Sequence, residues 1–79
     1  MKIEELVANV LELPLSLIKD SSGPATLKAW SSLKHIQLVA ALEEAYGVTL
    51  TRHEIQRLTS LAEVRRILQQ KSVEVGSTP

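Results

Sequence analysis

The sequence contains no cysteine, so disulfide bonds and thiolate metal ligands are excluded as sources of stability. It has no excess of charge, because nine basic side chains are balanced by nine acidic ones. This balance argues against nonspecific nucleic-acid binding, which needs a basic field. The first residues, Met1 to Glu5, lack the apolar run of a secretory signal or a transmembrane helix. We therefore expect a soluble, cytoplasmic monomer that binds neither nucleic acid nor membranes.

Histidine is scarce, and the two histidines, His35 and His53, do not lie in a metal-ligand spacing with carboxylates or with each other. We therefore expect no metal site. A hydrolytic triad needs a pocket that a chain of 79 residues rarely provides. His35 lies one helical turn from Ser32, but we interpret it as a packing partner of Trp30. The expected protein is not an enzyme.

Strand alternation and internal repeats are also lacking, and what is present is helical periodicity. In the first segment the apolar residues at helical spacing are Ile3, Leu6, Val7 and Val10. Pro14 disfavours helical geometry at Leu13, so this helix should end near there. A long connection of 14–30 follows, and its stretch of 20–24 is rich in turn-forming residues. The side chains expected to hold this connection over the core are Leu15, Leu17, Ile18 and Leu27.

The spacing predicts a second helix over about 31–46, with Gly47 as its left-handed C-cap. Its apolar side chains spread over more than half of the circumference: Leu33, Ile36, Leu38, Val39, Leu42 and Tyr46. The remaining stripe consists of Lys34, Gln37, Ala41 and Glu44. An apolar arc this wide predicts a central helix with neighbours on two sides.

Two capping-box patterns predict the last two helices. Thr51 with Glu54 would open a short third helix, and Ser60 with Glu63 would open a fourth. The residues expected to face the core from these helices are Ile55, Leu58, Leu61, Val64, Ile67 and Leu68. Together the patterns predict an all-α fold, a four-helix bundle with a long loop between helices 1 and 2 and a short third helix. We expect a single domain over 1–70 and a flexible tail over 71–79.

Ser31 and Ser32 lie where the second helix begins. Ser31 suits the N-cap, because its hydroxyl can accept from backbone N–H groups one turn further on. Ser32 would then be the first helical residue, with its hydroxyl directed outward at the positive end of the helix dipole. A phosphoester there is electrostatically favourable, and Lys34 would add a cation nearby. The dipeptide alone favours the simpler interpretation, in which both serines only cap the helix.

Residues 26–46 resemble the signature of the acyl carrier protein family. That family has Asp-Ser-Leu at the start of its second helix, followed by an apolar helix that ends in Leu-Glu-Glu and an aromatic–Gly pair. The matching positions here are Ser32-Leu33, Leu42-Glu43-Glu44 and Tyr46-Gly47. The similarity extends over about 3–70, and the family has the same order of four helices.

The resemblance implies that Ser32 bears 4′-phosphopantetheine, transferred from coenzyme A by a magnesium-dependent phosphopantetheinyl transferase. The thiol of this arm would hold an acyl or aminoacyl group as a thioester for loading and downstream enzymes of lipid, polyketide or other secondary biosynthesis. The partner-facing positions implied by the family are Leu33, Lys34, Gln37, Ala41, Glu43 and Glu44. A sheltered acyl chain would lie among core side chains such as Val7, Ile36, Val39, Leu42, Ile55 and Leu61.

The chain departs from the family at one position of the motif, where Ser31 replaces the usual Asp. A serine caps a helix as well as Asp does, but the lost carboxylate could weaken docking of the transferase. An unmodified carrier-like interaction module is therefore the first alternative. A small helical nucleic-acid-binding domain is the second, and the neutral net charge disfavours it.

Overall fold

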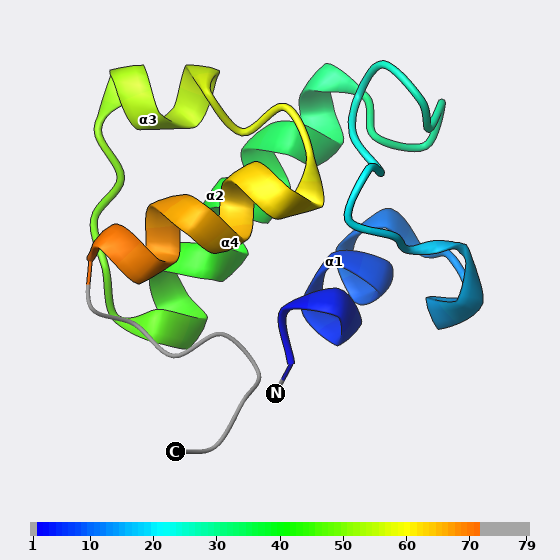
Figure 1. The fold of residues 1–79 in the computed structure, drawn as a ribbon, viewed down its shortest axis with the longest axis horizontal. Coiled ribbons are helices and arrows are strands. Elements are labelled where there is room, and N and C mark those ends of the chain that lie inside the picture. The colour runs from blue at the N-terminus through cyan, green and yellow to red at the C-terminus, as the bar shows by residue number, and fades with distance from the viewer. Residues whose placement is uncertain (1, 72–79) are drawn as a thin grey trace.

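The computed structural model describes residues 2–71, and within this range the chain is all-helical, without a strand (Figure 1). The elements in order are α1 (Ile3–Leu11), the 3₁₀ turn η1 (Leu15–Leu17), α2 (Ser32–Tyr46), α3 (Arg52–Gln56) and α4 (Leu61–Gln70). The predicted all-α fold with four helices, a long first loop and a short third helix is thus confirmed. Most of the predicted tail, from residue 72 onward, lies outside the described residues.

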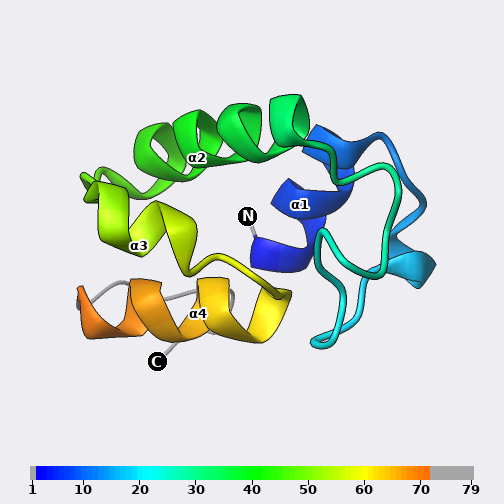
Figure 2. The same ribbon diagram turned by 90° about the horizontal axis from the view of Figure 1, so that it is seen from above.

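The helices enclose one aliphatic core that also contains the only tryptophan. In Figure 2, α2 and α4 run along opposite sides of the molecule. Between them, α3 lies at one end and α1 lies at the other. The largest fully buried side chains are Ile3, Val7, Trp30, Leu38, Leu42, Leu58, Leu61, Val64, Ile67 and Leu68. No helix within 2–71 is long and apolar enough to cross a membrane.

The first helix ends slightly before the predicted position. Its last helical residue is Leu11, and Glu12 adopts a left-handed conformation with φ of 58°. The backbone N–H of Leu13 then donates to the carbonyl of Ala8, at 3.0 Å, which satisfies an acceptor of the last turn. A left-handed residue ends the helix directly, so Pro14 follows a helix that has already stopped.

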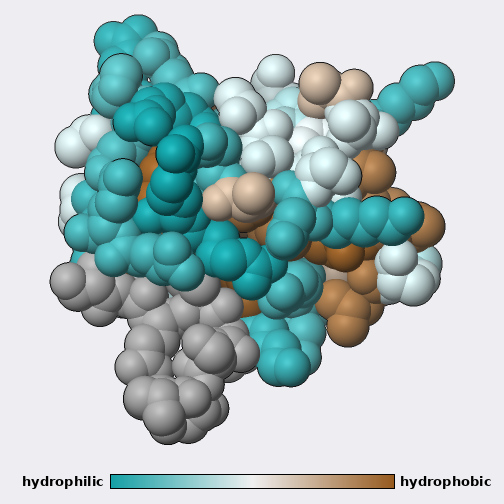
Figure 3. Space-filling model, viewed as in Figure 1, coloured by the Kyte–Doolittle hydropathy of each residue, from teal (hydrophilic) through white to brown (hydrophobic). Residues whose placement is uncertain are grey.

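The long loop is fixed to the core by some of the predicted side chains and not by others. Ile18 is buried and Leu27 is partly buried, as predicted. Leu15 and Leu17, in contrast, are 52% and 49% exposed, so their prediction is wrong. Both lie on η1, which turns them toward solvent before the extended backbone at Ile18 brings that side chain inward. Figure 3 shows apolar atoms at the surface on the side where α1 and η1 lie.

Backbone hydrogen bonds attach this loop to the first turn of α4. The amide of Leu61 donates to the carbonyl of Ser22 at 2.8 Å, and that of Ala62 donates to the carbonyl of Asp20 at 3.0 Å. These amides belong to the helix start, where N–H groups have no intrahelical acceptor. The buried Ser22 hydroxyl also accepts from the amide of Lys19, at 2.8 Å, which closes the loop locally. The loop therefore caps α4 with its own carbonyls.

Gly23 makes this close approach possible. A Cβ atom at this position would lie 2.1 Å from the backbone oxygen of Thr59. No side chain fits at that distance, so the segment before α4 and the long loop can meet only through a glycine.

The burial pattern of α2 is narrower than predicted. Leu38, Val39 and Leu42 are buried, whereas Leu33 and Ile36 are 63% and 67% exposed. The prediction that the whole apolar arc meets neighbours on two sides is therefore wrong. One face of the helix packs on the core, and the apolar side chains at its first two turns lie outside that face.

The predicted cap residues of the other helix ends are largely confirmed. Gly47 ends α2 with a φ of 63°, and Thr51 and Glu54 form a reciprocal capping box at α3. At α4 the Ser60 hydroxyl accepts from the amide of Glu63, at 3.2 Å. The Glu63 carboxylate does not close a second box, because it pairs with the Arg66 guanidinium.

The predicted core residues of α3 and α4 differ in how deeply they are buried. Those of α4 are all buried: Leu61, Val64, Ile67 and Leu68. Ile55 of α3 is only partly buried, and Leu58 is buried but lies beyond the end of that helix. A helix of five residues has room for one inward side chain, so the segment after it completes the contact.

An ion pair network joins α4 to α1 and to the long loop. The Arg65 guanidinium donates to the Glu4 carboxylate at 2.9 Å and to the Asp20 carboxylate at 3.1 Å. The hydrogen bond from Arg65 is the main reason that the pKa of Glu4 lies below its ordinary value. The same bond raises the pKa of Arg65, so both groups stay charged in the folded chain.

Candidate functional site at the start of α2

The two serines have separate positions at the start of α2. The Ser31 hydroxyl accepts from the amide of Lys34 at 3.2 Å, so Ser31 is the N-cap, as predicted. Ser32 is the first helical residue, and its side chain is exposed. Within 2–71 its hydroxyl has no hydrogen-bond partner. Because the cap is supplied by Ser31, the Ser32 hydroxyl is available for chemistry.

The electrostatic surroundings of Ser32 suit an anion. It opens a helix of 15 residues, and the first turn of that helix has no acidic side chain. The unpaired N–H groups at a helix start give it a partial positive charge, which favours a phosphate there.

Lys34 is placed differently from the prediction. Its ammonium group pairs with the Glu12 carboxylate at the end of α1, at 3.3 Å, and so is directed toward α1. The Glu12 side chain is mostly exposed, and an exposed ion pair of this kind contributes little stability. Lys34 thus joins α1 to α2, and the structure shows it paired with Glu12 instead of standing free beside Ser32.

Trp30, His35 and Ile55 form a chain of hydrogen bonds beneath the site. The buried Trp30 indole N–H donates to His35 Nδ1 at 3.0 Å, and His35 Nε2 lies 2.9 Å from the Ile55 carbonyl oxygen. These partners assign the neutral imidazole with its proton on Nε2. The predicted Trp30–His35 packing contact is therefore present, with a hydrogen bond added. It connects the loop, α2 and α3, and it occupies both nitrogens of the His35 ring.

A hollow of about 600 Å³ lies beside Ser32. It is lined by Pro24 and Lys28 of the long loop, by 30–32, and by His35 and Ile36 one turn into α2. No pattern in the sequence indicates this hollow, because its two sides are brought together only by the folding of the loop against α2.

The predicted partner-facing residues do not all lie on one surface. Leu33, Gln37 and Glu44 are exposed, and they share a stripe along α2 with Ile36 and Ala40. Ile36 and Ala40 were not among the predicted partner-facing residues, although they follow the same helical spacing.

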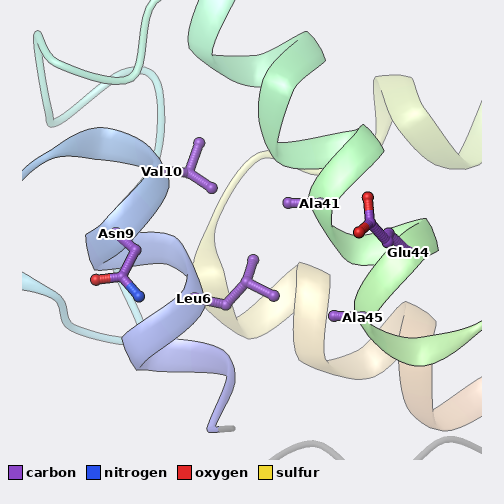
Figure 4. Close-up of a pocket in the computed structure, with 6 residues that line it drawn as sticks. All are labelled: Leu6, Asn9, Val10, Ala41, Glu44 and Ala45. Atoms are coloured by element: carbon purple, nitrogen blue, oxygen red, sulfur yellow. The ribbon is translucent and has the colours of Figure 1, made fainter.

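Glu43 and Ala41 lie away from that stripe. The Glu43 carboxylate accepts from the backbone amide of Leu50 at 2.8 Å, which holds the segment after α2 in place. Ala41 lines a groove of about 300 Å³ between α1 and α2 (Figure 4). The six lining residues are Leu6, Asn9, Val10, Ala41, Glu44 and Ala45.

The side chains expected to shelter an acyl chain are mostly packed. Val7, Leu42 and Leu61 are fully buried in the core, and Val39 is nearly so. Ile36 lies on the outer face of α2, so its assignment to the middle of the bundle is wrong.

The chain matches no known protein-family model, and no curated protein matches it significantly. The likeness to acyl carrier proteins therefore rests on the motif residues quoted above, and the function drawn from it is a proposal.

Proposed function

We propose that the protein is a carrier whose Ser32 bears 4′-phosphopantetheine. One observation supports this most directly: the Ser32 hydroxyl is exposed and unpaired within the described chain, because Ser31 supplies the cap. A serine that only stabilised the helix would be expected in the cap position instead.

The residues around Ser32 suit this group. The helix start would hold the phosphate through its backbone N–H groups, and no carboxylate of the first turn opposes it. The adjoining hollow provides room for the arm to leave the helix end. The arm supplies the thiol that the chain itself lacks, and this thiol holds an acyl or aminoacyl group as a thioester.

In the attachment step one bond forms and one bond breaks. Ser32 Oγ forms a bond to the phosphorus that bears the pantetheine, and the diphosphate bond of coenzyme A breaks. The adenosine 3′,5′-bisphosphate part leaves, and the hydroxyl proton passes to a base of the transferase. Magnesium belongs to that transferase, not to this chain. The expected partners are the transferase and the enzymes that load and use the cargo.

Mass spectrometry tests the proposal directly. The purified chain is incubated with coenzyme A, magnesium and each of several phosphopantetheinyl transferases. We expect a gain of one phosphopantetheine, no gain in Ser32→Ala, and a gain in Ser31→Ala. Ser31→Ala serves as the matched control, because it removes the neighbouring hydroxyl and should cost only about 1 kcal/mol of stability.

The replacement of the family's Asp by Ser31 favours one alternative, an unmodified interaction module. Absence of any mass gain with all transferases, in protein shown to be folded by circular dichroism, would refute the carrier and support that module.

A further inference from the structure

The hollow beside Ser32 has a cation on its rim that is free of ion pairs. Lys28 lines it and is exposed, and no carboxylate within 2–71 pairs with it. The other lysine near the helix start, Lys34, is already paired with Glu12. Lys28 is therefore the positive side chain best placed to contact a negatively charged group attached to Ser32.

Two other residues that line the hollow are apolar. Ile36 is 67% exposed, although large aliphatic side chains are usually covered, and Pro24 lies on the loop side. Trp30 and His35 are held together at the hollow by their hydrogen bond, so this part of the lining is preorganised. The hollow thus has a charged portion and an apolar portion close to one hydroxyl.

The phosphopantetheine arm has the same order of groups. Its phosphate comes first, a carbon with two methyl groups lies a few bonds further, and the two amides and the thiol follow. A phosphate would meet Lys28, and the two methyl groups would cover apolar surface of Ile36 and Pro24. Such burial would remove an exposed apolar side chain from water without opening the core.

We propose that this hollow binds the phosphate-proximal half of the arm, with Lys28 as the positioning residue for the phosphate. The inference rests on the proposed function, since the arm must first be attached to Ser32. It differs from shelter in the bundle interior, because the arm would lie on the loop side of α2. Its thiol end would remain accessible to partner enzymes.

Nuclear magnetic resonance of the modified protein tests this placement. Apo and fully modified protein, the latter verified by its mass, are compared through amide and indole N–H shifts. We expect shifts at Lys28, Ala29, the Trp30 indole and Ile36, in addition to those at Ser32 itself. In Lys28→Gln the shifts at Trp30 and Ile36 should fall, because the loss of one exposed ion pair lowers the equilibrium constant for the bound arm by up to about five-fold.

Two matched variants complete the experiment. Lys19→Gln removes the same charge from the loop at a residue that does not line the hollow, and Lys34→Gln removes the lysine already paired with Glu12. Both should keep the shifts of the unmutated holo-protein. Shifts confined to 31–34 would overturn the inference and leave the carrier function standing, whereas absence of the mass gain would refute the function itself.

Discussion

Adjacent residues of the same type have different roles at the start of α2. The Ser31 oxygen accepts from the amide of Lys34, while the Ser32 hydroxyl has no hydrogen-bond partner within the described chain. The difference arises from one step along the chain: the N-cap residue has extended backbone geometry, and the next residue is already helical. The position of the helix start therefore decides which serine caps the helix and which hydroxyl stays unpaired within 2–71.

Replacing the N-cap residue Ser31 tests whether the proposed transferase depends on the Asp carboxylate that acyl carrier proteins have at this position. Asp caps a helix as well as Ser does, so Ser31→Asp should leave the melting temperature nearly unchanged. If the transferase recognises that carboxylate, the variant should be modified faster than the unmutated chain in a timed mass-spectrometric assay. An equal rate in both proteins would show that the carboxylate is dispensable here.

His35 should matter for stability, because within 2–71 it is the one hydrogen-bond acceptor of the buried Trp30 indole N–H. We expect His35→Leu to lower the free energy of unfolding by about 1–3 kcal/mol, the usual cost of a buried polar group left unpaired. Urea denaturation followed by Trp30 fluorescence measures this, since the chain has one tryptophan. His53→Leu, at an exposed residue of α3, should stay within about 0.5 kcal/mol. Equal losses in both variants would contradict the assigned hydrogen bond.

At the scale of elements, the long loop is a structural part of the site. It caps α4 through the carbonyls of Asp20 and Ser22, and it lines the hollow beside Ser32 through Pro24 and Lys28. A loop of this length is usually variable in conformation, but here backbone bonds at its middle fix its path.

Gly23 provides the test of this loop contact. Gly23→Ala would force a Cβ atom against the backbone of Thr59, so we expect a loss of about 3 kcal/mol or more in unfolding free energy. Gly47→Ala is the matched control, because its surroundings are open and only its left-handed backbone is strained, by about 1–2 kcal/mol. Chemical denaturation gives both values. A smaller loss at Gly23 than at Gly47 would mean that the loop does not lie against the segment before α4.

The elements that local signals specify were predictable, and those that depend on distant contacts were not. The cap at Ser31 and the capping box at Thr51 follow from residues within one turn, and both are present. The pairing of Lys34 with Glu12 and the bond from Leu61 to Ser22 join residues far apart in sequence. No periodicity encodes such contacts, so the hollow beside Ser32 and the loop anchor became visible only in the folded chain.

Apolar periodicity also predicted more buried residues on α2 than the structure has. Leu33 and Ile36 follow the helical spacing of buried residues, yet both are exposed. Periodicity shows which residues could face one another but not how much of a helix its neighbours cover. At a proposed partner surface this excess of apolar side chains is expected, because a partner would cover them.

At the scale of the whole molecule, the ion pairs predict a pH dependence. Hydrogen bonding to Arg65 lowers the pKa of Glu4, and the Thr51 amide and the Arg66 guanidinium do the same for Glu54 and Glu63. A carboxyl whose folded-state pKa is depressed stabilises the fold fully above its unfolded-state pKa. That stability is lost as the pH falls through the folded-state pKa.

We therefore expect the melting temperature to fall as the pH is lowered from about 6 to about 3. In Glu4→Gln the decrease should be shallower, because this variant has no carboxylate to protonate at the Arg65 site. Glu5→Gln removes an exposed carboxylate of the same helical turn that has no ion pair within 2–71, and this variant should follow the unmutated chain. Calorimetry at a series of pH values distinguishes the two variants, and parallel curves would rule out the contribution of Glu4.

The anchoring of the long loop on α4 determines when the hollow beside Ser32 can form during synthesis. Until 59–62 have left the ribosome, the carbonyls of Asp20 and Ser22 lack the amides that hold them, and Gly23 has no backbone to rest against. A nascent chain would already contain Ser32, but without the surface that surrounds it in the finished fold. For the modification proposed above, an enzyme that recognises the loop together with α2 would thus act only after translation of α4.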